Sequence, residues 1–196
     1  EDVTKVYAAL KAAIYNYRLS LASPEEPLEL TSNMLSPGFE DNSKGWVCNG
    51  FSPQSNDAFE LKEGTYYCEI WSGWGNVADG DIHQIVELPN GNYQLTVLAQ
   101  NIQESNKAIP QKGAYVYANN ARKELSLTGK YTLDFVVVDN QAKIGVNTIG
   151  CTGNKVSIDD FHIYYTGFDD DAQFAEFRQM IQEGEALLES PQHADS

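Results

Sequence analysis

Two stretches of the chain alternate between apolar and polar residues. From 93 to 99 and from 131 to 137, every second residue is apolar and most residues between them are polar. Since successive side chains of a strand point to opposite faces of a sheet, this period of two indicates strands with one buried face. Such faces must be covered by a second layer of structure.

The same period recurs in short runs along the middle of the chain. Pro89-Asn90-Gly91 separates two of these runs, and Asn-Gly favours the positive φ angles of a tight turn, so the sequence predicts a hairpin there. The runs show no alternation with helices, which predicts an all-β domain. The expected strands are 46–50, 57–62, 65–71, 82–88, 92–101, 113–118, 121–128, 131–137, 141–148 and 155–165.

The two ends of the chain have a helical period instead. A stripe of apolar residues predicts a helix over 2–22, which Pro24 and Pro27 end, and a second stripe after Asp169 predicts a helix over 171–189. The two helices could pack against each other or against the sandwich, but we favour a larger helical region of the parent protein. The first stripe consists of Val3, Val6, Tyr7, Leu10, Ile14, Tyr17 and Leu21.

Acidic residues outnumber basic ones by 28 to 13, a formal net charge of −15. Such a surface repels phosphate backbones and anionic headgroups, so neither nucleic acid nor a membrane surface is an expected partner. No run approaches the roughly 18 apolar residues that span a bilayer, and the first residues lack the pattern of a signal peptide.

Three cysteines, Cys48, Cys68 and Cys151, are odd in number and widely spaced. They match neither a disulfide framework nor a zinc site, and we expect them to be small core residues. A bridge between Cys48 and Cys68 stays open.

Residues 33–41, followed by Gly45-Trp46, resemble the opening strand of carbohydrate-binding modules in the galactose-binding-like jelly-roll group, typified by families four and nine. Residues 156–165 are similar to the closing strand of these modules. The stretches 67–71, 88–93 and 114–118 resemble the version in large surface proteins of glycan-degrading gut bacteria. The resemblance covers about residues 31–166.

This resemblance implies a two-sheet antiparallel jelly-roll sandwich over 28–166, with a flanking helix on each side, in 1–23 and 169–190. The first and last strands should be neighbours. The implied function is that of a non-catalytic carbohydrate-binding module in a larger secreted or cell-surface bacterial protein, with glycan and neighbouring domains as partners. The alternative is a structural or protein-interaction domain without a sugar ligand.

Modules of this group often hold a structural calcium ion, and the residues that match the pattern are Glu40 in Gly-Phe-Glu and Asp159 in Ile-Asp-Asp. Calcium takes six to eight oxygen ligands, so backbone carbonyls or water would have to complete the shell, with Asp41 and Asp160 as reserve donors. The alternative is a pair of exposed acidic turn residues.

A Gly-rich loop with two indoles predicts the sugar site. Indoles stack on the apolar face of a pyranose while polar side chains pair with its hydroxyls. If Cys68 and Ile70 face the core, the residues between and beside them share the opposite face. Trp74, flanked by glycines, should be the most exposed, whereas Trp71 could instead cap the core. The predicted ligand-binding residues are Tyr67, Glu69, Trp71, Trp74, Asn76 and Asp79.

Two further aromatic groups lie outside this loop. Trp46 should belong to the core. Tyr115 and Tyr117 share one face of a strand, either in the core or as a binding platform, and the sequence leaves both alternatives open.

Catalysis is not expected. Asp159 and Asp160 are adjacent on a strand, so they should point to opposite faces unless a bulge intervenes, which is poor geometry for paired acid and base groups. His83, His162 and His193 lack the spacing of metal ligands, and no nucleophile motif occurs.

Overall fold

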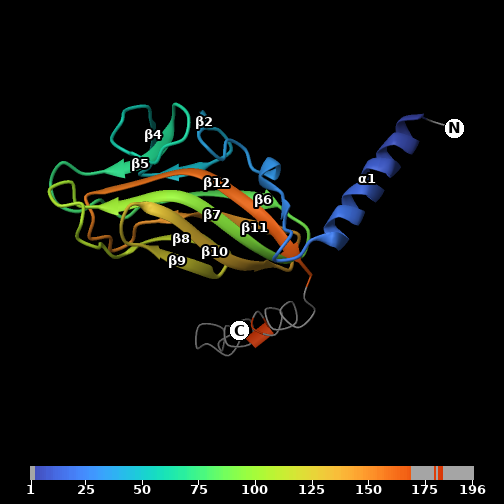
Figure 1. Ribbon diagram of the computed structural model, residues 1–196. Coiled ribbons are helices and arrows are strands. Elements are labelled where there is room, and N and C mark those ends of the chain that lie inside the picture. Colours follow the sequence, from blue (N-terminus) through green and yellow to red (C-terminus); the bar gives the residue numbers. More distant parts are fainter. Residues whose placement is uncertain (1–2, 169–178, 180, 183–196) are drawn as a thin grey trace, which may run out of the picture.

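A computed structural model describes residues 3–168, 179, 181 and 182, and it shows two packed antiparallel sheets with a helix at the N-terminal end (Figure 1). The six-stranded sheet has the order β10-β7-β12-β5-β4, and β1 also pairs with β12. Its strands are β1 (Leu28–Glu29), β4 (Ser52–Gln54), β5 (Tyr67–Trp71), β7 (Gly91–Ile102), β10 (Gly129–Val137) and β12 (Lys155–Gly167).

The five-stranded sheet has the order β3-β6-β11-β8-β9. Its strands are β3 (Val47–Asn49), β6 (Asp81–Glu87), β8 (Ala114–Ala118), β9 (Ala121–Leu125) and β11 (Gln141–Asn147). A short 3-10 helix, η1 (Thr31–Asn33), and strand β2 (Glu40–Ser43) lie between β1 and β3. This architecture confirms the predicted all-β, two-sheet antiparallel sandwich.

The core lies between the two sheets, and long strands such as β6, β10 and β11 contribute about every second residue to it. In β8, Ala114, Val116 and Ala118 are fully buried, whereas Tyr115 and Tyr117 on the outer face are half-buried. Small core residues in β8 therefore leave the two tyrosine rings on the outside of the sandwich.

Phe39, Trp46 and Phe161 form an aromatic cluster within the core. The ring of Trp46 lies 5.2 Å from that of Phe39 and 5.0 Å from that of Phe161, measured between centroids. Trp46 is thus a core residue, as predicted. The expectation that the first and last strands are neighbours is also confirmed, because Leu28 pairs with Tyr165.

The predicted hairpin at Pro89-Asn90-Gly91 is wrong. Strand β6 before it belongs to the five-stranded sheet and β7 after it to the six-stranded sheet, so the turn connects the two layers. Only Gly91 in this turn has positive φ, at 149°, and a Cβ there would lie 2.8 Å from the carbonyl oxygen of Gly167. The glycine is needed for a close backbone approach, whereas a type I′ hairpin needs two central residues with positive φ.

The strand expected over 57–62 is also absent, because these residues form a loop. Phe59 is fully buried, and its ring centroid lies 5.6 Å from that of Tyr67 on the outer face of β5. The apolar residues of this stretch therefore cover the six-stranded sheet from outside, although their pattern is similar to that of a strand.

The cysteines differ in environment. Cys68 and Cys151 are buried as expected, but Cys48 is exposed on the short edge strand β3, and all three are free thiols. Burial raises the pKa of the Cys68 and Cys151 thiols.

Helix α1 (Val3–Leu21) lies where a helix over 2–22 was predicted, and it projects from the end of the sandwich (Figure 1). No residue of α1 is fully buried; only Tyr15 and Leu19 near its C-terminal end pack against the core. The predicted second helix lies outside the described residues except for Gln179, Ile181 and Gln182, which are helical. Within the described part of the chain, no helix is long and apolar enough to cross a membrane.

Candidate functional site

The predicted indoles lie where β5 ends and the chain crosses to β6. Trp74 is 95% exposed and Trp71 is 55% exposed. The loop around Trp74 is fixed by Ser72, whose hydroxyl donates to the Trp74 carbonyl oxygen at 2.9 Å. Trp74 therefore presents an open ring to solvent, whereas Trp71 is only about half exposed.

Trp71 is held in place by its neighbours. Its indole Nε1 donates to Glu104 Oε2 at 2.8 Å, and the Nζ of buried Lys155 lies 2.5 Å from Glu104 Oε1 and 5.9 Å from the Trp71 ring. The hydrogen bond from Lys155 also keeps the pKa of Glu104 below its usual range. Contacts within the protein thus fix the position of the Trp71 ring.

The remaining predicted contacts divide into two groups. Asn76 Oδ1 accepts from Gln103 Nε2 at 3.2 Å, and Asp79 Oδ1 accepts from the backbone N–H of Gly150 at 3.1 Å. These two side chains brace the exposed loop.

Tyr67 and Glu69 correct the prediction of an open face beside Trp71. Tyr67 is fully buried and Glu69 is 7% exposed, because the 55–62 loop covers them. The Tyr67 hydroxyl lies 2.7 Å from Asn56 Oδ1 and 3.1 Å from Glu69 Oε2. Their side chains hold the loop to the sheet and present no surface to a ligand.

The predicted calcium ligands, Glu40 and Asp159, both bind the 63–66 loop. Glu40 Oε1 accepts from the backbone N–H groups of Thr65 and Tyr66, each at 2.8 Å, and Asp159 Oδ2 accepts from that of Glu63 at 2.8 Å. Gly64 has a positive φ of 71°, which other residues rarely adopt, and a Cβ there would lie 2.5 Å from Glu40 Oε1, so a substitution would displace the Glu40 carboxylate. The alternative of two exposed turn acids is wrong for Asp159, which is fully buried.

Asp159 is electrostatically strained. Burial is the main reason that its pKa is raised to about 7, and the negative charges of Asp160 and Glu40 add to the effect. Asp159 and Asp160 also lie at the bulge that the sequence left open, because the pairing of β12 with β7 shifts register between Asp159 and His162. Among the described residues, no group of three or more His, Cys, Asp or Glu could hold a metal ion.

The structure decides the position of Tyr115 and Tyr117, and it gathers polar groups around them. Two cross-strand rows run over the outer face of the five-stranded sheet, which we call the tyrosine face. One row is Asn49, Asp81, Asn147, Tyr115 and Glu124; the other is Val47, His83, Gly145, Tyr117 and Arg122. A hollow of about 360 Å³ lies over this face.

Gly145 in the central strand makes room for a tyrosine to cross it. A Cβ at this position would lie 2.9 Å from Tyr117 Cζ and 2.8 Å from His83 Cβ. Because that space is free, the Tyr117 phenol reaches from β8 over β11, and its hydroxyl donates to Asp81 Oδ1 of β6 at 2.9 Å. The ring thus lies across the sheet.

Asp81 is the centre of the polar network. His83 Nδ1 lies 2.6 Å from Asp81 Oδ2, and Asn147 Nδ2 donates to Asp81 Oδ1 at 3.3 Å. Burial opposes ionisation of Asp81, but the hydrogen bonds from His83, Tyr117 and Asn147 hold its pKa below its usual range. Asp81 is therefore a fixed acceptor that orients the groups around it.

A cationic side chain lies over each of the two rings. Arg122 Cζ lies 5.7 Å from the Tyr115 ring centroid, and Lys143 Nζ lies 5.7 Å from that of Tyr117. The two tyrosine rings are 6.1 Å apart and tilted by 56°. The tyrosine face thus combines flat aromatic surfaces with hydrogen-bond donors and acceptors, and it contains both positively and negatively charged side chains.

Sequence reasoning missed Asp81, His83 and Gly145 as members of a site. Asp81 and His83 alternate with apolar Ile82, which was a signal that they share an outer face. An isolated glycine within a strand pattern also marks a close approach of another group. Neither signal shows which strand lies alongside, and that information came from the pairing.

The fold is shared with solved structures of low sequence identity. The carbohydrate-binding module TmCBM61, solved with beta-1,4-galactotriose, is 19% identical, with a TM-score of 0.54 over 68% of this chain and 97% of that one. A cyclase from Fischerella sp. TAU is 12% identical, with a TM-score of 0.53 over 73% of this chain and 99% of that one. No protein-family profile matches the sequence, and no curated protein matches it significantly. The similarities confirm the jelly-roll-like fold; the assignment to family four or nine stays a prediction.

The raised pKa of Asp159 predicts a pH dependence of stability in calcium-free buffer with chelator. The folded state keeps the Asp159 proton up to about pH 7, whereas the unfolded state loses it near pH 4, so the folded state binds more protons between these values. The free energy of unfolding should therefore fall as pH rises from 4 to 8, by at most about 4 kcal/mol from this group. Urea unfolding across this range measures it. Asp159→Asn should lack this part of the dependence, and parallel pH profiles for the two proteins would contradict the assignment.

Proposed function

We propose that this protein is a non-catalytic carbohydrate-binding domain and that a neutral glycan lies across the tyrosine face. The observation that carries the proposal is the pair of half-buried rings, Tyr115 and Tyr117, which lie on the outer face of β8 among ordered polar groups. Large aromatics usually serve packing, so their position outside an intact core calls for a ligand.

The chemistry of this face suits a sugar. A pyranose has an apolar C–H face that stacks on a flat ring and a rim of hydroxyl groups that both donate and accept hydrogen bonds. Asp81 supplies acceptor oxygens, Arg122 supplies donors, and Asn147 supplies both. A hollow of about 360 Å³ is within the range of small-ligand sites.

The net charge of −15 supports a neutral ligand, since an anionic polymer would be repelled at long range. The fold neighbour TmCBM61 was solved with beta-1,4-galactotriose, and this agrees with the proposal at the level of the fold. The alternative function, a structural or interaction domain without a sugar ligand, predicts that the tyrosine face binds no glycan.

We propose that the loop of residues 72–80, which carries Trp74, makes a second contact with the glycan at the end of the five-stranded sheet where β6 begins. Residues 72–80 lead directly into Asp81, and Asp79 is tied to Gly150 beyond the end of β11. A glycan chain that extends beyond Tyr115 would leave the sheet at this end, where Trp74 offers a fully exposed ring. We also propose that the domain acts outside the cell, next to other domains of a bacterial surface protein, as the sequence resemblance implies.

A structural calcium ion near Glu40 and Asp159 is part of the proposal. Asp159 has a buried carboxylate with two acidic neighbours, Asp160 and Glu40, and a hard divalent cation would offset this charge. The oxygen donors suit calcium chemically, although backbone carbonyls or water would have to supply most of the shell. Bound calcium would fix the 63–66 loop against β12.

The first test replaces the stacking ring of the tyrosine face. Tyr115→Ala should weaken glycan binding at least tenfold while leaving the melting temperature nearly unchanged, because the ring is half-exposed and its strand neighbours stay in place. Affinity electrophoresis against a panel of neutral polysaccharides measures the change. Tyr115→Phe keeps the ring and should keep binding, and Ile85→Ala removes an exposed apolar side chain elsewhere on the same sheet face. A panel that shows no binding by the unaltered protein at millimolar concentrations would support the structural alternative.

The second test concerns the loop. Trp74→Ala should abolish most of the affinity for long glycans without a change in melting temperature, since shallow sugar sites depend on one or two stacking faces. Isothermal titration with oligosaccharides of increasing length separates its contribution from that of Tyr115. Equal affinity of the variant and the parent for every length would remove Trp74 from the site.

Calcium should raise the melting temperature by mass action, and more at pH 8 than at pH 5.5, because the ion binds the ionised form of Asp159. Differential scanning calorimetry with excess calcium or excess chelator measures this. Glu40→Gln and Asp159→Asn should lose the response, whereas exposed Glu25→Gln should retain it. Identical melting curves with calcium and with chelator at both pH values would rule the ion out.

A further inference from the structure

Helix α1 carries a second pattern, distinct from the contacts that join it to the sandwich. Large apolar residues follow one another at alternating steps of four and three, which is the heptad spacing of a coiled-coil seam. A stripe with this regular spacing is narrower than the face that a helix usually turns to a globular core. The seam consists of Val3, Tyr7, Leu10, Ile14, Tyr17 and Leu21.

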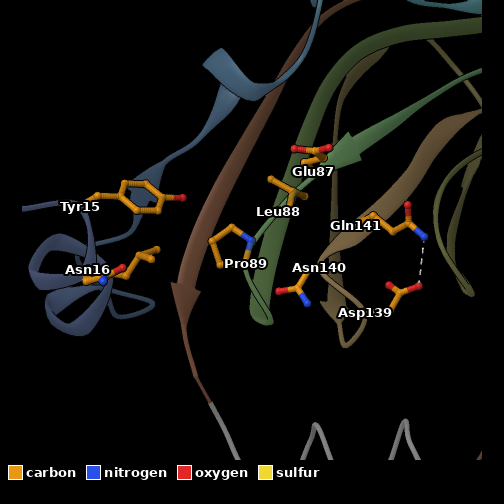
Figure 2. A pocket seen from close by; sticks show the side chains of 9 residues that line it. Tyr15, Asn16, Glu87, Leu88, Pro89, Asp139, Asn140 and Gln141 are labelled. Atoms are coloured by element: carbon orange, nitrogen blue, oxygen red, sulfur yellow. Dashed lines mark hydrogen bonds between the residues drawn. The ribbon is translucent and has the colours of Figure 1, made fainter. Parts of the chain in front are cut away.

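All six seam residues are exposed to solvent, with exposed fractions between 51% for Ile14 and 80% for Val3. The sandwich contacts a different side of the helix. Tyr15 and Asn16 of α1 line a cleft of about 560 Å³ together with Glu87–Pro89 and Asp139–Gln141. Figure 2 shows these groups on opposite sides of the cleft. The sandwich therefore leaves the seam uncovered.

This arrangement leaves the helix with little tertiary support. Isolated helices shorter than about 12–15 residues are marginal in water, so α1, with 19 residues, is only a few residues above this limit. Most helical stability in proteins comes instead from packing of the apolar face. In α1 the packed residues, Tyr15 and Leu19, lie near the C-terminal end. The N-terminal half needs a partner for its apolar side chains.

We propose that the seam of α1 pairs with the same seam of a second copy of this chain, in a parallel two-stranded coiled coil. Tyr15 and Leu19 lie on the outer side of such a pair, so the two sandwiches do not obstruct the contact. Covering six large side chains on each helix removes on the order of 1,000 Å² from water, the lower bound for a specific interface.

The charges of α1 favour the parallel arrangement. The helix contains three cations and no acidic residue. In the heptad, Lys11 and Arg18 border the seam, and in a parallel pair they lie across from Val6 and Ala13 of the partner subunit. An antiparallel pair would instead bring Lys11 against Lys11 of the partner subunit. The Lys11 ammonium also lies 4.7 Å from the Tyr7 ring of its own helix.

Analytical ultracentrifugation of the full chain from about 5 to 500 μM tests the association. This range brackets the dissociation constant that we expect for the dimer, which is in the micromolar range. The parent protein should change from monomer to dimer across this range. Leu10→Glu should stay monomeric, because it buries a charge in the seam. Ala9→Glu makes the same charge change on another face of α1 and should dimerise as the parent does. The melting temperature of the sandwich controls for folding of each variant.

Oxidation of Leu10→Cys tests the orientation, in a Cys48→Ser background that removes the exposed native thiol. A parallel pair places the two introduced cysteines opposite each other, so a covalent dimer should form. Asn16→Cys, on the side that faces the sandwich, should give at least tenfold less covalent dimer. A parent protein that is monomeric at 500 μM, a Leu10→Glu variant that still dimerises, or a dimer that fails to cross-link at residue 10 would each overturn the proposal.

Discussion

Strand β12 joins the parts of this molecule through hydrogen bonds to three other strands. One edge of β12 pairs with β7 along most of its length, whereas the opposite edge pairs first with β5 and then with β1. The bulge after Asp159 lies at this change of partner, and Asp160 adopts a positive φ of 51° there. An extra residue in a strand reverses which side chains face inward. Before the bulge Ile158 faces the core, and after it Phe161 and Ile163 do.

The bulge places Phe161 of the aromatic cluster directly after the acidic pair in β12, where it faces the core. Without the bulge, Phe161 would point away from Phe39 and Trp46. Asp159 comes before the bulge and lies on the outer side of the sheet, because its neighbour Ile158 faces the core. There it accepts a hydrogen bond from the backbone N–H of Glu63 in the 63–66 loop. Burial of this carboxylate is an electrostatic cost that packing of the neighbouring aromatic rings helps to offset.

Much of the fold could be predicted from local pattern, because alternation reports which side of a strand is buried. It identified most of the strands and the exposure of Trp74, but it missed that 57–62 is a loop and left open which face of β8 is buried. It failed at Asn90-Gly91, since a tight-turn dipeptide does not specify whether the next strand stays in the same sheet. For the same reason, the sequence identified only part of the tyrosine face. Tyr115 and Tyr117 could be placed on one side of a strand, but their neighbours Asp81 and His83 come from β6, with β11 between the two strands. Gly145 connects them, and its role depends on register, which the sequence alone leaves unspecified.

The three tryptophans of the chain lie in three different environments, and this has a spectroscopic consequence. Trp46 is buried among aromatic rings, Trp71 is fixed between water and a buried lysine, and Trp74 is almost fully hydrated. Indole fluorescence shifts to longer wavelength as the ring becomes more hydrated. The emission at the blue edge therefore reports the integrity of the core through Trp46, while the emission at the red edge and its quenching by small solutes report what covers Trp74. One unlabelled sample thus carries separate optical signals for unfolding of the sandwich and for any change in the solvent exposure of Trp74.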